Sequence, residues 1–169
     1  MVSTQTMTTP PLYAFDITLH RLVDGGTDPG RLGDVHADAW GTWSTLAVPH
    51  EALATPMAAD FDESFDRLRA LDRMFVEPDG SFVWTSPREG VSWQVDGNAF
   101  EKEGRVLLVD LKGSCPADAF DLLLGAFGWP REPLMIQLVR PAVFLDEPTF
   151  RRHAAARGLA GDGETLRPR

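Results

Sequence analysis

The sequence predicts an α/β (α+β) fold, in which a mixed central β-sheet is flanked by helices. Apolar and polar residues alternate over 12–22, which is typical of a half-buried strand, and several later segments carry apolar residues at helical spacing. Between two of these helical segments, residues 91–112 have the pattern of a β-hairpin. At 169 residues the chain can bury a core of its own. We expect one domain over 12–158, with disordered ends at 1–11 and 159–169.

The N-terminal third contains one clear strand and one irregular stretch. In the strand at 12–22, one face carries Tyr13, Phe15, Ile17 and Leu19, and the other carries Ala14, Asp16, Thr18 and His20. Residues 23–57 are rich in Gly, Asp and Pro, so only a short helix or strand can be predicted there.

A helix is expected to begin at Asp60. Glu63 follows three residues later, as in a capping box, and apolar residues then recur at helical spacing as far as Phe75. Pro78-Asp79-Gly80 predicts a turn, and residues 81–85 predict a short strand.

The remaining elements follow from periodicity and from Pro and Gly positions. In order, they are hairpin strands at 91–101 and 105–112, a helix from Pro116 stopped by Gly128 and Pro130, a strand at 134–139 resuming at 142–145, and a helix from Asp146 to Arg157 ended by Gly158. From Asp60 onward the core order is therefore α-β-β-β-α-β, with an N-terminal strand before it and a C-terminal helix after it.

The hairpin carries the candidate site. Asp96 lies on its first strand, and Asp110 and Lys112 lie on its second. A three-residue turn at 102–104 would pair Asp96 with Asp110 and Gln94 with Lys112, whereas a two-residue turn would put the two acids on opposite faces. Paired carboxylates can share Mg²⁺, a hard ion that takes oxygen ligands. Lys112 would then help to deprotonate a metal-bound water and stabilise charge on a phosphate.

This element order, with an acid on the second strand and Asp-x-Lys on the third, resembles the restriction-endonuclease-like (PD-(D/E)xK) nuclease superfamily over residues 60–145. The resemblance implies a metal-dependent phosphodiester hydrolase, with Asp96 and Asp110 as metal ligands and Lys112 as the catalytic cation. Two features depart from the family pattern. Asp96 follows Val95 where the family has Pro, and the acid before x-Lys is Asp, where Glu is commoner.

The resemblance also suggests secondary site residues. Some branches of the superfamily place a glutamate on the first helix and a glutamine on the strand after the second helix, which here correspond to Glu63 and Gln137. A separate phosphate-binding role is predicted for Gly113 and Ser114, because the helix expected near Pro116 would direct its free N–H groups toward Lys112.

The hairpin also fits a purely structural role, in which Asp96-Gly97 forms a bend and Asp110 and Lys112 are solvated. The net charge of −9 and the pI near 4.8 give no support to broad nucleic-acid affinity. They favour a non-catalytic protein-binding or adaptor domain of the same or a similar fold, with a basic partner. An unrelated α+β domain with a ferredoxin-like meander is a third possibility.

The sequence contains two further, weaker candidates for a reactive or metal-binding site. Cys115 at the start of a helix could have a lowered thiol pKa, although a small buried residue is the favoured interpretation. His36, with Asp34 and Asp38, alternates as if on one strand face and could bind a metal, although such acids are usually solvated.

Composition suggests a compartment. The sequence contains no run of eighteen apolar residues and no signal-peptide pattern at its N-terminus, so we expect no membrane association. A single cysteine cannot form an internal disulfide, which fits a reducing cytoplasm.

Overall fold

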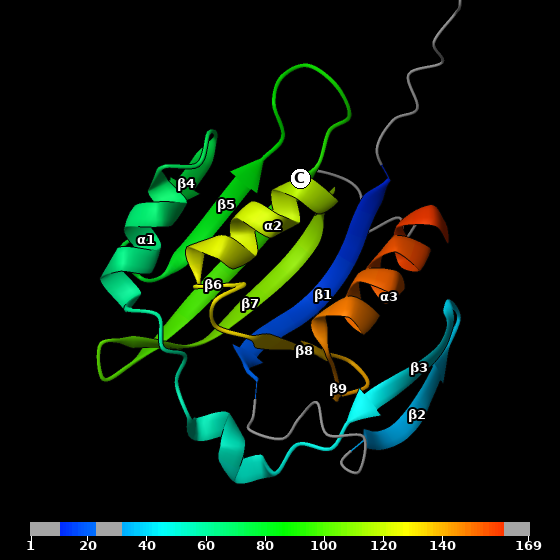
Figure 1. The fold of residues 1–169 in the computed structure, drawn as a ribbon. Helices are drawn as coiled ribbons and strands as arrows, with labels where there is room; N and C mark the ends of the chain where they lie inside the picture. The colour runs from blue at the N-terminus through cyan, green and yellow to red at the C-terminus, as the bar shows by residue number, and fades with distance from the viewer. Residues whose placement is uncertain (1–10, 23–31, 161–169) are drawn as a thin grey trace, which may run out of the picture.

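The computed structural model describes residues 11–22 and 32–160, and the strands of this part form one nine-stranded sheet (Figure 1). The strands are β1 (Leu12–Arg21), β2 (Leu32–Asp38), β3 (Gly41–Leu46), β4 (Met74–Val76), β5 (Ser81–Thr85), β6 (Gln94–Lys102), β7 (Arg105–Pro116), β8 (Leu134–Leu138) and β9 (Val143–Leu145). The helices are α1 (Phe61–Arg69), α2 (Ala117–Ala126), α3 (Glu147–Ala160) and the short 3₁₀ helix η2 (His50–Ala54).

The strand order is β2-β3-β9-β8-β1-β7-β6-β5-β4, and every neighbouring pair is antiparallel. The α+β class is therefore confirmed, but the prediction of a mixed sheet is wrong. The predicted core order is not found either. Four strands, not three, separate α1 from α2, and β1 lies between β7 and β8.

Strand β1 occupies the centre of the sheet because both of its faces can be buried. Tyr13, Phe15, Ile17 and Leu19 on one face are at most 9% exposed, and Ala14, Thr18 and His20 on the other are at most 8% exposed. A central position also gives β1 backbone hydrogen-bonding partners on both sides, β7 and β8.

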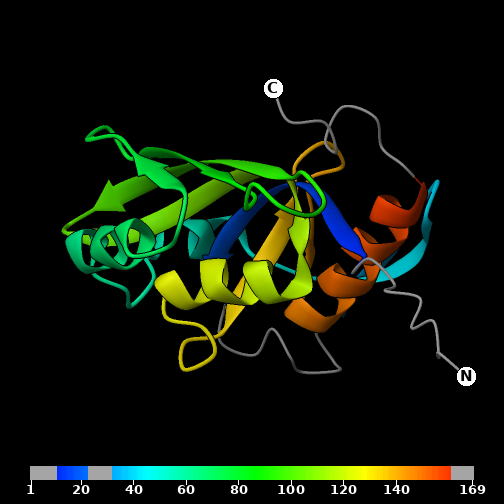
Figure 2. The same ribbon diagram turned by 90° about the horizontal axis from the view of Figure 1, so that it is seen from above.

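The three helices lie in one layer on a single face of the sheet (Figure 2). The Phe15 ring meets them there, with its centroid 5.4 Å from that of Phe120 on α2 and 6.3 Å from that of Phe150 on α3. The hydrophobic core therefore lies between this face and the helices. We call the opposite face of β5, β6, β7, β1 and β8 the open face, because no helix of the described residues covers it (Figure 2).

Helix α1 begins where expected but ends early. The Asp60 carboxylate accepts a hydrogen bond from the Glu63 amide at 3.0 Å, which confirms the predicted cap. The helix ends at Arg69, and Arg73 has a φ of 60°, which a helix cannot include. Phe75 belongs to β4, where its side chain is 62% exposed, so the helical stripe predicted as far as Phe75 is wrong at its end.

The segment that could not be assigned from sequence contains the β2–β3 hairpin and η2. Asp38 organises the hairpin turn, since its Oδ1 accepts hydrogen bonds from the amides of Trp40 and Gly41 and from the Trp43 indole, at 2.9, 3.2 and 3.0 Å. Residues 23–31, part of the same uncertain stretch, lie outside the described residues.

The C-terminal helix is capped as predicted, because the Asp146 carboxylate accepts a hydrogen bond from the Thr149 amide at 2.8 Å. It continues through Gly158 to Ala160, three residues beyond the predicted end at Arg157, so the prediction that Gly158 stops the helix is wrong. The disorder predicted for the two ends of the chain otherwise falls on residues 1–10 and 161–169, outside the described part. Among the described residues, no helix has the length and apolar character needed to span a membrane.

Candidate functional site

The β6–β7 hairpin differs from the predicted one in its register. Its turn has two residues, Glu103 and Gly104, with φ of 53° and 79°, and Lys102 pairs with Arg105. A two-residue turn was expected to put Asp96 and Asp110 on opposite faces. A β-bulge at Leu107 changes that outcome, because the register shifts by one between the Phe100 and Glu101 pairs.

The two acids consequently share the open face but are not directly opposite each other. Asp96 faces Lys112 across the two strands, and Asn98 faces Asp110. The predicted pairing of Asp96 with Asp110, and of Gln94 with Lys112, is therefore wrong by two residues, while the prediction of a common face is confirmed.

Strand β1 adds two residues to this group. Asp16 pairs with Lys112 and Thr18 pairs with Asp110. Lys112 therefore lies between Asp96 and Asp16 in one cross-strand row. The Thr18 hydroxyl donates a hydrogen bond to Asp110 at 2.8 Å. Asp16 was visible in the sequence only as a polar position of the N-terminal strand, and nothing local indicated that it would lie beside Lys112.

The acids fit a shared metal ion less well than predicted. Asp96 and Asp110 occupy diagonal positions, whose Cβ atoms lie about 7 Å apart in an antiparallel pair. Lys112 occupies the position between Asp96 and Asp16 in the cross-strand row, so a cationic residue shares the face with these acids. In the described part of the chain, no three His, Cys, Asp or Glu side chains are grouped to hold a metal ion.

The secondary candidates are dispersed. Gln94 lies beside the row and donates a hydrogen bond to Asp96 at 2.8 Å. Gln137 lies on the same face, where it pairs with Thr18 and contacts His20 at 3.4 Å. Glu63 lies in the first turn of α1, which packs in the helix layer, and its partner is Arg67 at 3.8 Å.

Helix α2 begins at Ala117 with Pro116 as its N-cap, as the sequence predicted. Strand β7 continues through Gly113 and Ser114 to Pro116, so Lys112 lies within the strand, four residues before that N-cap. Gly113 and Ser114 are both buried, and a Cβ added to Gly113 would lie 2.0 Å from the Gln94 carbonyl oxygen.

Cys115 is also buried in β7, and burial raises its thiol pKa far above the ordinary value, which makes it unreactive.

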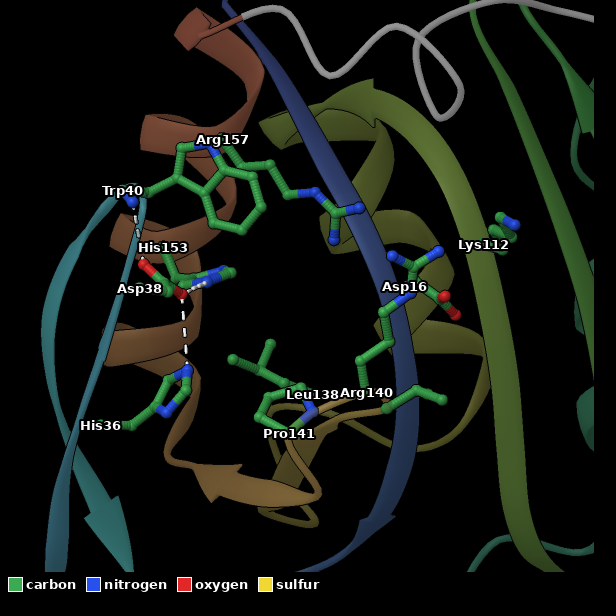
Figure 3. Close-up of a pocket in the computed structure, with 11 residues that line it drawn as sticks. Asp16, His36, Asp38, Trp40, Lys112, Leu138, Arg140, Pro141, His153 and Arg157 are labelled. Atoms are coloured by element: carbon green, nitrogen blue, oxygen red, sulfur yellow. Dashed lines mark hydrogen bonds and ion pairs between the residues drawn. The ribbon is translucent and has the colours of Figure 1, made fainter.

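A cavity of about 640 Å³ lies next to the Lys112 row. Strand β8 ends at Leu138, which pairs with Ile17 of β1. The N-terminal half of β1 therefore does not pair with β8, and the cavity opens there. Its walls come from β1, β7, β2, the β8–β9 turn and α3 (Figure 3). The polar and charged lining residues are Asp16, His36, Asp38, Lys112, Arg140, His153 and Arg157, and the apolar and aromatic ones are Trp40, Leu138, Val139 and Pro141.

One wall of the cavity is a hydrogen-bonded group on Asp38. The Asp38 Oδ2 atom lies 2.8 Å from Nε2 of His153 and 3.6 Å from Nε2 of His36 (Figure 3). Burial disfavours ionisation of Asp38, but hydrogen bonds from Trp43, Trp40 and His153 outweigh burial and lower its pKa. Burial also lowers the pKa of His153, and the bond to Asp38 only partly offsets that effect.

The other side of the cavity is cationic. Lys112 comes from β7, Arg140 from the β8–β9 turn and Arg157 from α3, and the two arginine side chains extend toward the same part of the cavity (Figure 3). The Arg157 guanidinium also lies over the Trp40 ring, 5.1 Å from its centroid. His36 and Asp38 were noted in the sequence as neighbours on one strand face, but Arg140, His153 and Arg157 carried no local signal of a site.

Comparisons of the chain with protein-family models, with curated proteins and with solved structures found no match.

Proposed function

We propose that this protein binds a small organic anion, with a carboxylate or phosphate group, in the cavity beside Lys112. The observation that carries the proposal is the convergence of Lys112, Arg140 and Arg157 from three separate elements on one cavity. The overall charge of the chain is −9, so a cationic cavity runs against its composition. Guanidinium and ammonium groups are the side chains that recognise carboxylates and phosphates in proteins.

The acids of the cavity offset this charge only in part. The Asp38 carboxylate already accepts hydrogen bonds from Trp40, Gly41 and Trp43, and its second oxygen is bonded to His153. Two carboxylates, Asp16 and Asp38, therefore share the lining with the three cations, which leaves an excess of one positive charge. An anion in the cavity would form charge-assisted hydrogen bonds with the Arg140 and Lys112 side chains, and these bonds supply binding energy.

The size and lining of the cavity suit a ligand of metabolite size. Its volume of about 640 Å³ falls within the range of about 300–1,000 Å³ typical of small-molecule sites. Trp40, Leu138 and Pro141 provide apolar surface for the uncharged part of such a molecule.

Anion binding can be tested by calorimetry and thermal unfolding at low salt, with a panel of monocarboxylates, dicarboxylates and nucleoside monophosphates. We expect at least one anion to raise the melting temperature, because a ligand that binds only the folded state stabilises it. Arg140→Gln should weaken that binding about ten-fold or more, or about 1.4 kcal/mol.

Arg131→Gln is the matched control, since Arg131 is also an exposed arginine in a turn but does not line the cavity. A panel in which no anion stabilises the protein, or equal weakening by both variants, would overturn the proposal.

A metal-dependent phosphodiester hydrolase remains the second candidate. It is favoured by the common face of Asp96, Asp110 and Lys112, and by the position of Lys112 at the edge of the cationic cavity. In this candidate the two acids hold Mg²⁺ and Lys112 contacts the phosphate. The diagonal placement of the acids supports it less than direct pairing would.

The two candidates separate experimentally. A hydrolase should cleave bis(p-nitrophenyl) phosphate or a short oligonucleotide in millimolar Mg²⁺ or Mn²⁺, the metal should raise the melting temperature, and Asp110→Asn should abolish both effects. Anion binding without cleavage and without a metal response would leave only the binding function.

The buried, unpaired Cys115 is compatible with a cytoplasmic location for either function.

A further inference from the structure

The open face carries two shallow hollows outside the cavity, each of about 350 Å³. They are adjacent, because Thr18 and Asp110 line both. The first hollow also includes Asp96 and Asn98. The second also includes His20, Gln137 and three apolar residues near the turn of the β6–β7 hairpin.

The apolar part of the second hollow results from the β-bulge. Leu107 is the extra residue of β7, and both Leu107 and Leu108 line the hollow together with Phe100. Phe100 is 42% exposed, although it lies on β6, which has a neighbouring strand on each side. Uncovered apolar area of this kind marks surfaces that bind another molecule.

The polar part of the hollows is acidic and held in place. The Thr18 hydroxyl fixes Oδ1 of Asp110, and the Gln94 amide fixes Oδ1 of Asp96, each at 2.8 Å. Both donors are neutral, so they orient the carboxylates without cancelling their charge. Among the described residues that line the hollows, Lys112 is the one cation, against Asp16, Asp96 and Asp110.

We infer that the open face around Asp110 and Phe100 is a docking surface for a protein segment that bears arginine or lysine side chains next to apolar ones. A basic side chain has an aliphatic stem and a charged head. Its stem would pack on Phe100 and Leu108, while its head would bond to Asp110, so the surface matches both parts. Without a metal ion on them, the acids repel phosphate groups and favour a basic protein segment over a nucleic acid. A basic partner also matches the net charge of the chain.

The test uses the peptide Ala-Arg-Leu-Arg-Ala-amide with fluorescein on its N-terminal amine, and measures its binding by fluorescence anisotropy at low salt. The Gln-for-Arg version of the peptide is the probe control. We expect the full-length protein to bind the Arg peptide, and Asp110→Asn and Phe100→Ser each to weaken binding about ten-fold or more. Phe100 is already exposed, so its replacement should leave the fold intact, as judged by circular dichroism.

Asp66→Asn is the matched control for charge. It removes one exposed carboxylate from α1, in the helix layer, and should leave the anisotropy curve unchanged. No binding of the Arg peptide, equal binding of the Gln peptide, or equal weakening by Asp66→Asn and Asp110→Asn would overturn the inference. A concentration-dependent dimer that Phe100→Ser abolishes would overturn it too, by assigning the surface to a second copy of the chain.

Discussion

The Nε2 atom of His153 lies 2.8 Å from Oδ2 of Asp38, although the two residues are 115 positions apart in the chain. This bond joins α3 to the β2–β3 hairpin. The His153 ring is only 2% exposed and makes edge-to-face contacts with Trp40 and Trp43, with centroids 5.5 and 5.1 Å apart. The bond therefore closes one side of the cavity that we propose binds an anion.

The environment of His153 predicts loss of stability in mild acid. Burial lowers the pKa of the folded imidazole below 6.5, and its buried Nδ1 has no hydrogen-bond partner among the described residues, which suits the neutral form. The unfolded chain therefore takes up a proton that the folded chain lacks, and the free energy of unfolding falls as the pH drops below about 6.5. Burial lowers the pKa of His20 in the same direction, against the opposing effects of Gln137 and Asp110.

We expect His153→Gln to reduce the loss of unfolding free energy between pH 7 and pH 5, by up to about 1.4 kcal/mol per pH unit. Urea unfolding at pH 7, 6 and 5 measures this slope. His50→Gln, at an exposed position in η2, is the control and should unfold with the wild-type pH dependence. A wild-type slope in His153→Gln would show that other groups cause the acid sensitivity.

Arg151 should stabilise the contact between α2 and α3 in a way that lysine cannot reproduce. Its side chain is 18% exposed, pairs with Glu147 and, at 2.5 Å, with Asp121, and lies over the Trp129 ring with 5.2 Å to the centroid. A planar guanidinium can make both ion pairs and stack, whereas an ammonium cannot. We expect Arg151→Lys to lower the free energy of unfolding by about 1–2 kcal/mol.

The neighbouring position supplies the control for this substitution. Arg152 is exposed, and Arg152→Lys should change the free energy of unfolding by less than about 0.5 kcal/mol in the same urea titration. Equal effects of the two substitutions would mean that the stacked geometry of Arg151 contributes nothing measurable.

Gly97 is required by the ring of Phe82, which lies over it from the neighbouring strand. A Cβ at position 97 would lie 2.1 Å from the Phe82 Cζ atom, and Phe82 is 2% exposed, so the ring has little room to move. We expect Gly97→Ala to lower the free energy of unfolding by about 1–3 kcal/mol, measured with denaturant, and a second change, Phe82→Leu, to recover part of that loss.

Gly125→Ala in α2 is the control. A Cβ at this position meets no atom within 4 Å, so the substitution should instead raise the free energy of unfolding by up to about 1 kcal/mol.

The turn of the β6–β7 hairpin predicts a stabilising substitution. Glu103 has a φ of 53°, which asparagine adopts more readily than glutamate, and Asn-Gly is the favoured pair for a two-residue turn with positive φ at both positions. Glu103→Asn should raise the midpoint of thermal unfolding, corresponding to about 0.5–1 kcal/mol. Glu103→Gln removes the same charge without the conformational preference, so an equal gain in that variant would attribute the effect to charge.

The sequence alone was sufficient to predict the helices and strands whose formation depends on residues close together in the chain. The alternation in β1, the cap at Asp60 and the apolar stripe that includes Phe120 each predicted an element that the structure contains. These predictions succeed because a strand or helix must bury one face, and its periodicity records which face that is. The common face of Asp96 and Asp110 was also predicted, although the turn and the pairing behind it were not.

Only the tertiary structure decided which elements meet. The bulge at Leu107 and the insertion of β1 between β7 and β8 set the partners of Lys112, and neither has a signature within one segment. The cavity joins Asp38 with Arg140 and His153, which follow it by 102 and 115 positions in the chain. Periodicity shows which side of an element is buried but carries no information on what it is buried against, because that choice depends on the free energy of the whole packed chain.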